Sequence, residues 1–303
     1  MKVLVTGGAG FIGSHLVDAL AARGDEVAVI DNLRRGRREF IAGSGARFVE
    51  GDIRDADAIE ASTAGAEVVF HLAAQSNVLG AMSDIDYSFS TNVVGTFNVL
   101  KAAARADVRR VVFSSSREVY GEPEALPVAE TAPLTAKNPY GASKVAGEAY
   151  CRTWTTLGET ECSILRFANV YGRRDRDRVI PLWLERATRG EELVVYGGQQ
   201  VLDLVPVATV VQAMLRAAER PAQEPINIGA GSGTRILDLA ARILELTGSR
   251  AELAIHPARG AEVVRFVADI TRMRDLLGVE PPADALDGLV ELVDDILRTP
   301  QTS

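Results

Sequence analysis

Two residues that could move a proton stand four positions apart in the segment "PYGASK". Tyr140 and Lys144 would share one face of a helix, because residues at this spacing are neighbours on a helix surface. A free tyrosine has a pKa of about 10 and is a poor base at neutral pH, and lowering that pKa by about three units requires about 4 kcal/mol of selective stabilisation of the phenolate. The ammonium group of Lys144 is one source of that stabilisation. The pair therefore predicts a tyrosine that takes a proton from an alcohol.

Three serines end a predicted strand ahead of that helix, in "RRVVFSSS". Side chains at the carboxyl end of a parallel strand lie at the edge where α/β proteins bind ligands. The hydroxyl of Ser116 could therefore hold a substrate oxygen, and we expect Ser116, Tyr140 and Lys144 to form the catalytic group. The histidines His15 and His71 carry no clear chemical signal, and we expect both to have packing roles.

A glycine-rich segment, "VLVTGGAGFIG", lies between a predicted strand and a predicted helix. Gly8, Gly10 and Gly13 have the GxGxxG spacing, in which glycines allow a tight turn, close approach of the backbone to a pyrophosphate, and close packing of helix on strand. The N-terminus of the following helix offers unpaired N–H groups to that pyrophosphate. Asp31, at the end of the next predicted strand, can accept hydrogen bonds from an adenosine ribose and would repel a 2′-phosphate. The pattern predicts bound NAD, whose positively charged nicotinamide ring would further stabilise the phenolate.

The basic run from Arg34 to Arg38 could favour NADP instead, but beside Asp31 we interpret it as a solvated loop. Small or apolar residues at other strand ends, in "GDIRD" and "HLAAQ", could flank the adenine and let the backbone approach the cofactor. The complete set expected to contact NAD is Gly7, Gly8, Gly10, Phe11, Ile12, Gly13, Asp31, Asn32, Asp52, Ile53, Leu72, Ala73, Ala74, Asn92, Ser114, Tyr140, Lys144 and Phe167.

The composition of the 303-residue chain is that of an ordinary globular protein, with 47% hydrophobic and 24% charged residues. A net charge of −8 argues against a general nucleic-acid binder, which needs a basic surface. Cys151 and Cys162 are the only cysteines and lack a metal-ligand spacing, so neither a disulfide framework nor a zinc site is expected. Since neither a signal peptide nor an apolar run of about 20 residues is evident, we expect a cytoplasmic protein without a membrane span.

Short β-branched segments alternate with helical patterns through the first half of the chain. This alternation predicts an α/β protein with a doubly wound parallel sheet, a Rossmann fold. We expect residues 1–168 to form the NAD-binding domain and residues 203–230 to return to it. Residues 169–202 and 231–303 would form a smaller C-terminal lobe that binds the substrate, with three helices and one short strand, "AELAIH", in its second part.

This combination resembles the extended short-chain dehydrogenase/reductase family, in particular its NAD-dependent nucleotide-sugar epimerases and dehydratases. The similarity extends over nearly the whole chain, because "TGGAGFIGSHL", "DNL", "GDIRD", "HLAAQSNV", "TNVVGTFNVL", "SSSREVYG", "PYGASK", "RFANVYG" and "NIGAG" follow in the family's order. The resemblance implies that NAD stays bound and oxidises a nucleotide sugar at C4. Return of the hydride to the other face of the 4-keto sugar would invert C4, and a UDP-hexose of the UDP-glucose/UDP-galactose type is the expected substrate. It also implies a homodimer built on helices around residues 83–104 and 140–157.

The resemblance also assigns residues to the nucleotide sugar. Asn169 in "RFANVYG" matches an asparagine directed at the sugar nucleotide, Arg259 an arginine that contacts the diphosphate, and Glu262 an acid that contacts the uridine ribose. Leu202 stands where many relatives have a further arginine. The complete set expected to contact the substrate, with no metal site, is Ser76, Ser116, Arg117, Glu118, Asn169, Arg176, Val179, Arg259 and Glu262.

Alternative activities follow from Arg117, Glu118 and Arg176. Dehydratases of this family carry an Asp–Glu acid–base pair where this chain has Arg117 and Glu118, and arginine cannot donate a proton near neutral pH. A dehydratase or decarboxylase that uses Glu118 therefore ranks below an epimerase. Arg176, or Arg117, could instead hold the carboxylate of UDP-glucuronate, although a solvated loop is the simpler interpretation of the Arg176 segment. A catalytically silent NAD-binding sensor is a distant alternative, against which the intact catalytic group argues.

Overall fold

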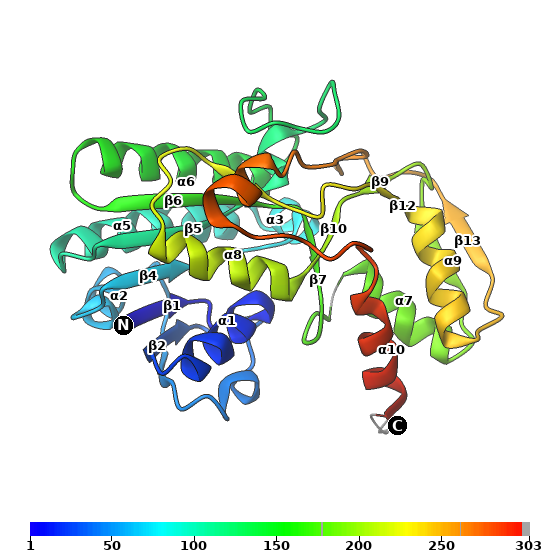
Figure 1. Ribbon diagram of the computed structural model, residues 1–303, viewed down its shortest axis with the longest axis horizontal. Helices are drawn as coiled ribbons and strands as arrows, with labels where there is room; N and C mark the ends of the chain where they lie inside the picture. Colours follow the sequence, from blue (N-terminus) through cyan, green and yellow to red (C-terminus); the bar gives the residue numbers. More distant parts are fainter. Residues whose placement is uncertain (177, 261, 299–303) are drawn as a thin grey trace.

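The computed structural model describes residues 1–176, 178–260 and 262–298. Helices and strands alternate through most of the chain (Figure 1). The strands are β1 (Lys2–Thr6), β2 (Glu26–Asp31), β3 (Arg47–Glu50), β4 (Val68–His71), β5 (Arg110–Ser116), β6 (Glu161–Phe167), β7 (Asn169–Tyr171), β8 (Leu193–Tyr196), β9 (Val201–Leu202), β10 (Leu204–Pro206), β11 (Ile226–Ile228), β12 (Thr234–Arg235) and β13 (Leu253–His256). The helices are α1 (Phe11–Ala22), α2 (Ala56–Thr63), α3 (Val78–Ser83), α4 (Ile85–Phe89), α5 (Thr96–Arg105), α6 (Pro139–Thr156), α7 (Val179–Thr188), α8 (Val207–Glu219), α9 (Ile236–Thr247) and α10 (Gly288–Arg298), with short 3₁₀ or π turns at η1 (Arg38–Ile41), η2 (Ser90–Gly95), η3 (Arg117–Tyr120) and η4 (Met273–Leu277).

A seven-stranded parallel sheet in the order β11-β6-β5-β4-β1-β2-β3 forms the centre of the molecule. The strand order reverses beside β1, because successive crossovers run toward β3 on one side and from β4 toward β11 on the other. Ligands of such sheets bind outside the carboxyl ends of the strands at this reversal. The predicted fold class, a doubly wound Rossmann sheet, is therefore confirmed. β11 joins the sheet beside β6, with Ile226 opposite Leu165.

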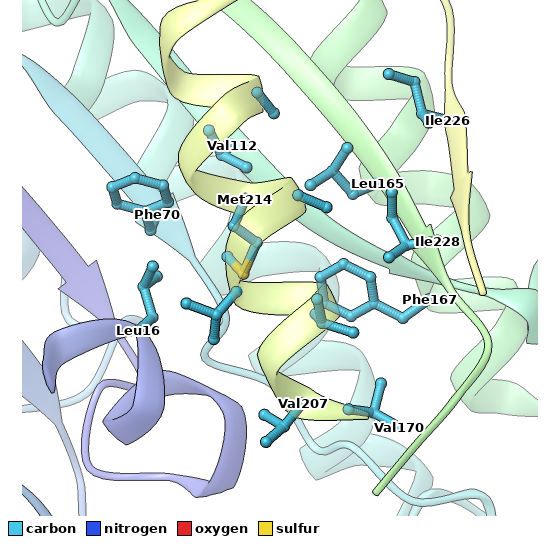
Figure 2. Close-up of a cluster of buried hydrophobic side chains, with 14 of the residues drawn as sticks. Leu16, Phe70, Val112, Leu165, Phe167, Val170, Val207, Met214, Ile226 and Ile228 are labelled. Atoms are coloured by element: carbon cyan, nitrogen blue, oxygen red, sulfur yellow. The ribbon is translucent and has the colours of Figure 1, made fainter. Parts of the chain in front are cut away.

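Two apolar layers cover the sheet, because successive side chains of a buried strand point to opposite faces. In β1, Val3 and Val5 pack in one layer and Leu4 packs in the other. Helices α1 and α8 complete the first layer, to which Met214 of α8 and Phe167 of β6 both belong (Figure 2). Residues of α2, α5 and α6 complete the second layer. Each fully buried side chain of this size stabilises the fold by about 1.5–3 kcal/mol, so both layers hold the strand ends in place.

The chain leaves the central sheet at the carboxyl end of β6 and enters a smaller unit, at one end of the molecule in Figure 1. This unit contains the antiparallel pair β12-β9, the parallel pair β13-β8 and helices α7, α9 and α10. It has a core of its own, which includes Trp183, Leu193, Leu239 and Leu289. Within the described ranges, no helix is long and apolar enough to cross a membrane.

Candidate functional site

A cavity of about 700 Å³ lies at the carboxyl ends of the central strands. A volume of this size is typical of sites for small organic ligands and cofactors. The glycine loop after β1, the serines that end β5 and the Tyr140–Lys144 pair of α6 all border it, so the two chemically suggestive stretches of the sequence share one space. The predicted residues that line it are Gly7, Gly10, Phe11, Ile12, Gly13, Asp31, Asn32, Ile53, Leu72, Ala73, Ala74, Ser76, Ser114, Ser116, Arg117, Glu118, Tyr140, Lys144, Phe167, Asn169 and Arg176.

Two residues that were expected to contact the cofactor lie behind the lining rather than in it. Gly8 has a packing role, because a Cβ atom there would lie 2.7 Å from Cγ1 of Val29 in β2. The carboxylate of Asp52 is engaged by Arg54 at 2.8 Å and by Asn32 at 2.9 Å. The hydrogen bond from Arg54 lowers the pKa of Asp52 to about 2. Asp52 thus orients Asn32, which does line the cavity.

Four further predicted residues also lie outside the lining. Asn92 is 2% exposed, and Val179 begins α7. The guanidinium of Arg259 stacks 3.6 Å from the ring centre of Tyr196 and lies 3.4 Å from the carboxylate of Glu262. The structure therefore does not bring Val179, Arg259 and Glu262 to the catalytic group, and their contacts with a nucleotide stay predictions.

The glycine loop has the geometry of a cofactor cradle. Gly7 has φ +71°, and a Cβ atom there would lie 2.7 Å from the backbone nitrogen of Ala73. At Gly13, in the first turn of α1, a Cβ atom would lie 2.2 Å from the carbonyl oxygen of Gly7. Only glycine lets the loop, α1 and the end of β4 approach so closely. The loop and the N-terminus of α1 therefore fit the pyrophosphate of NAD.

Replacing Gly13 by alanine is expected to deplete NAD from the purified protein and to lower its Tm by about 5 °C or more. The added methyl group meets a backbone carbonyl, which no side-chain rotation can move away. NAD released on denaturation and a thermal melt measure the two effects. Gly43→Ala is the matched control, because a Cβ atom there has no neighbour within 4 Å. Equal behaviour of both variants would refute the cradle.

Asp31 is held in a fixed orientation at the end of β2. Its Oδ2 accepts from the backbone N–H of Ala9 at 3.0 Å, and its Oδ1 accepts from that of Leu33 at 2.9 Å. Burial raises the pKa of Asp31, and these two backbone donors oppose that rise. Each carboxylate oxygen can accept a second hydrogen bond, so Asp31 can still receive ribose hydroxyls. Gly36 packs against it, with a hypothetical Cβ atom 2.6 Å from Oδ1.

The arginines of the basic loop after Asp31 are exposed, as expected of a solvated loop, and three of them also border the cavity. Arg34, Arg35 and Arg37 line the cavity, and the guanidinium of Arg34 stacks on the ring of Tyr87 at 3.8 Å. The sequence alone could not show this, because the loop is folded back over the strand end by tertiary contacts. The positive groups lie at the end of the cavity where the glycine loop would place the adenosine half of a dinucleotide.

Lys144 lies in the wall of the cavity with its side chain buried and its charge directed at the backbone. It is 3% exposed, and its Nζ donates to the carbonyl oxygen of Ser114 at 2.7 Å. Nζ also lies 5.9 Å from the ring centre of Tyr140 and 4.9 Å from that of Phe113. Burial lowers the pKa of Lys144 to about 8, so the ammonium form still predominates at neutral pH.

The expected lowering of the Tyr140 pKa is not produced by the protein alone. Burial raises the pKa of Tyr140 to about 12, and the positive charges of Arg178 and Arg117 and a hydrogen bond with Ser116 only partly oppose this rise. Lys144 lies beside the ring, whereas Ser116 engages the hydroxyl. The phenolate therefore needs a further positive charge at the site, and a bound nicotinamide ring has that charge.

Glu118 is bound on both of its carboxylate oxygens. Oε1 lies 3.0 Å from Nη2 of Arg117, and Oε2 accepts from the side-chain amide of Asn138 at 2.8 Å. The side chain of Glu118 is 6% exposed, so this ion pair is largely withdrawn from water. Nη1 of Arg117 is buried and has no hydrogen-bond partner among the described residues. Glu118 is thus held as a paired carboxylate, while Arg117 keeps a donor for another group.

Sequence reasoning missed several lining residues. Arg178 acts on Tyr140 from the loop before α7, and its only sequence signal was membership of an arginine-rich segment. The described residues contain no cluster of His, Cys, Asp or Glu side chains that could hold a metal ion. The unpredicted lining residues are Ile30, Leu33, Arg34, Arg35, Gly36, Arg37, Phe40, Gly51, Gln75, Asn77, Val78, Tyr87, Thr91, Ser115, Ala168, Val170, Arg174, Asp175 and Arg178.

Known proteins are similar to this chain along almost its whole length. Residues 3–229 match the model of the NAD dependent epimerase/dehydratase family. The chain is 38% identical to a putative UDP-glucose 4-epimerase of Methanocaldococcus jannaschii, over 96% of this chain and 97% of that protein. The structure of UDP-glucose 4-epimerase from Thermotoga maritima with UDP-glucose superposes with a TM-score of 0.94 at 36% identity, covering 98% of this chain and 99% of that one. The structure of the Thermus thermophilus enzyme with NAD has a TM-score of 0.92 at 34% identity, covering 99% of this chain and 100% of that one. This chain belongs to the NAD-dependent epimerase/dehydratase family, within the extended short-chain dehydrogenases/reductases.

Proposed function

We propose that this protein inverts C4 of a UDP-hexose of the UDP-glucose/UDP-galactose type, with NAD as its bound cofactor. The observation that carries the proposal is the single cavity that holds the glycine loop together with Ser116, Tyr140 and Lys144. The similar T. maritima epimerase was solved with UDP-glucose and the T. thermophilus epimerase with NAD, which supports both ligands.

Each side chain of the site has its own role in the transfer of the proton. When bound, NAD supplies the oxidant that reversibly accepts hydride from a carbinol carbon. The phenolate of Tyr140 takes the proton of the sugar 4-hydroxyl and later returns it to the same oxygen. Ser116, which is hydrogen-bonded to Tyr140, holds that oxygen, and the Lys144 ammonium favours the phenolate. Because the glycine cradle would hold the cofactor, and so the exchange of hydride, on one fixed side of the cavity, inversion requires the keto sugar to turn its other face to that side.

Dehydration or decarboxylation by Glu118 is the weaker alternative. A general acid must hold a proton near the operating pH. Both carboxylate oxygens of Glu118 are instead engaged by donors, one by Arg117 and the other by Asn138. Glu118 therefore orients Arg117 better than it could donate a proton.

UDP-glucuronate is a second candidate substrate, supported by the unpaired Nη1 of Arg117. Arginine suits a sugar carboxylate because its guanidinium presents several donors in a plane. Arg176 suits this role less well, because its guanidinium carbon lies 5.3 Å from the ring centre of Phe40, a residue that follows the basic loop after Asp31. Of the two, Arg117 acts on Tyr140, and so it lies closer to the reacting end of the cavity.

NMR of the purified protein with UDP-glucose, UDP-glucuronate and their C4 epimers tests the proposal. Inversion of the hexose pair at C4 is the expected result. Inversion of the glucuronate pair alone would transfer the assignment to the carboxylated sugar. A stable 4-keto-6-deoxy or pentose product would mean that Glu118 is a working acid or base. No conversion by protein with NAD bound would favour the silent sensor.

We also propose that the protein is a homodimer. Large apolar side chains on α3 to α6 are exposed, and Phe97 packs edge-on against Tyr150 and Trp154 with ring centres 5.5 Å apart in each pair. A contiguous apolar surface of this kind marks an interface, and a second copy of the chain would cover it with a matching face. The exposed residues are Leu79, Met82, Ile85, Phe89, Val94, Phe97 and Tyr150.

Light scattering at micromolar concentration is expected to give the mass of two chains, and Phe97→Glu is expected to give one. A charge placed in the centre of the apolar surface would be buried without a partner in the dimer. Ile255→Glu, on the exposed strand β13, is the control and should stay dimeric. A monomeric wild-type protein would overturn the proposal.

Two coarser assignments accompany these proposals. We assign the cofactor to residues 1–168 with 203–230 and the sugar nucleotide to residues 169–202 and 231–303, of which 177, 261 and 299–303 lie outside the described residues. The separate apolar core around Trp183 supports this division. We further propose a cytoplasmic protein that binds neither membranes nor nucleic acid, and its net charge of −8 argues against nucleic-acid binding.

A further inference from the structure

A buried histidine outside the cavity links the glycine loop to the catalytic helix. His71 ends β4 and is 1% exposed. Its Nδ1 lies 2.7 Å from Oγ1 of Thr6, the last residue of β1, and its Nε2 lies 2.9 Å from Oγ1 of Thr96, the first residue of α5. The imidazole therefore joins the strand that leads into the glycine loop to a helix of the second apolar layer.

The neighbouring hydrogen bonds determine which nitrogen of His71 carries the proton. The hydroxyl of Thr96 donates its single hydrogen to the carbonyl oxygen of Asn92 at 2.6 Å, so it accepts from Nε2–H. Nδ1 then accepts from the hydroxyl of Thr6, which itself accepts from the backbone N–H of Ala73 at 3.2 Å. Burial lowers the pKa of His71 to about 3, with the nearby Lys144 charge adding to this, so the ring stays neutral.

The path continues from Asn92 to the catalytic helix. The side-chain amide of Asn92 donates to Oγ of Ser143 at 2.9 Å. Ser143, in the first turns of α6, donates to the carbonyl oxygen of Tyr140 at 2.7 Å. The hydrogens therefore point one way within two runs, from the Ala73 N–H to the Asn92 carbonyl and from the Asn92 side-chain amide to the Tyr140 carbonyl, and the covalent frame of Asn92 joins the two runs. Bonds aligned in this way strengthen one another, so a break at one position weakens its neighbours.

The path is closed to water over its whole length. Its side chains are at most 5% exposed, with Ser143 at 5% and His71 at 1%. A broken bond there cannot be replaced by solvent, and an unpaired buried group must instead shift its neighbours to find a partner. Both ends of the path carry site residues, because Ala73 borders the cavity and lies against Gly7 of the cradle.

We propose that His71 is a positioning residue, which fixes α6 against the glycine loop and so sets the distance of Tyr140 and Lys144 from the cofactor. This inference rests on the assignment of Tyr140 as the proton-transfer residue. The sequence indicated only a packing role for His71, and the proposal adds the positioning of α6 to it. His71 does not line the cavity, so it acts on the site through its neighbours.

Thr96→Val tests the path, because valine has nearly the same shape as threonine but lacks its hydroxyl. Loss of the hydroxyl removes the partner of Nε2–H and is expected to lower kcat about tenfold, with KM changed less than about twofold. Thr96→Ser restores the hydroxyl and should recover most of kcat. The matched control is Thr63→Val in α2, where a buried threonine makes the same bond to the carbonyl of Ile59, at 2.7 Å, outside the path. Equal loss in the control, or full activity of Thr96→Val, would overturn the proposal.

Two further measurements do not depend on catalytic turnover. The ¹⁵N NMR spectrum of the NAD-bound protein is expected to show His71 with Nε2 protonated and Nδ1 unprotonated from pH 5 to pH 8, and protonation of Nδ1 would overturn the path. Amide hydrogen exchange should quicken in the first turns of α6 in Thr96→Val and His71→Phe, but not in Thr63→Val. Unchanged exchange in both path variants would also overturn it. If the wild-type protein inverted no sugar, the proposed function would fail while these two results still decided the positioning role.

Discussion

Tyr140→Phe is expected to lower kcat about 1,000-fold or more while KM for the nucleotide sugar changes less than about threefold. The variant loses the one group that takes the proton of the sugar hydroxyl, and phenylalanine keeps the shape and burial of the ring. The neighbouring hydroxyl of Ser116 cannot replace it, because Ser116 already accepts from the backbone N–H of Glu118 at 3.2 Å and is far less acidic than a phenol. Kinetics at saturating substrate, followed by NMR at C4, give kcat and KM separately.

Tyr150→Phe is the matched control for this variant. It makes the same change in the same helix, on an exposed face away from the cavity, and should leave kcat unchanged. Both variants should retain as much NAD as the wild-type protein. If Tyr140→Phe kept kcat within about tenfold of the wild-type value, another residue would have to act as the base.

The sequence predicted those parts of the site that depend on local spacing. The positions of Gly10 and Gly13 follow from the turn between a strand and a helix, whereas Gly8 of the same motif lies behind the lining. Tyr140 and Lys144 share a face because they are four residues apart. Parallel strands end at one edge, and so the segments that follow them had to meet. Those rules require no knowledge of how distant segments pack.

Features that depend on packing between distant segments could not be predicted. Glu118 accepts a hydrogen bond from Asn138, which approaches it from the start of α6. Arg34 stacks on Tyr87 of α4, a contact that no local pattern indicates. The role of His71 rests on hydroxyls of β1 and α5 that only the folded chain brings together.

Lys144→Met is expected to lower kcat about 100-fold and to move the acid limb of the pH profile of kcat/KM to higher pH. In the protein without ligands, burial holds the pKa of Tyr140 at about 12, and the active phenolate must form against that cost. Removing the ammonium beside the ring raises the pKa of Tyr140 further. Since the base works only when deprotonated, a higher pKa means that activity appears at higher pH. Rate measurements across a pH series test the direction, with Lys2→Met on the surface as the control.

The stability of Lys144→Met separates a catalytic role from a structural one. Burial lowers the pKa of Lys144 to about 8, below the value of an unfolded lysine, so the charged form destabilises the fold, fully below pH 8 and progressively less as the pH rises toward the unfolded pKa. Methionine removes that cost, but leaves the carbonyl oxygen of Ser114 without its donor. These effects oppose each other, and the Tm at pH 7 should change by less than about 5 °C. A large fall in Tm together with the loss of kcat would assign Lys144 to the fold, whereas loss of kcat in a stable protein means that a buried charge is retained for the chemistry of Tyr140.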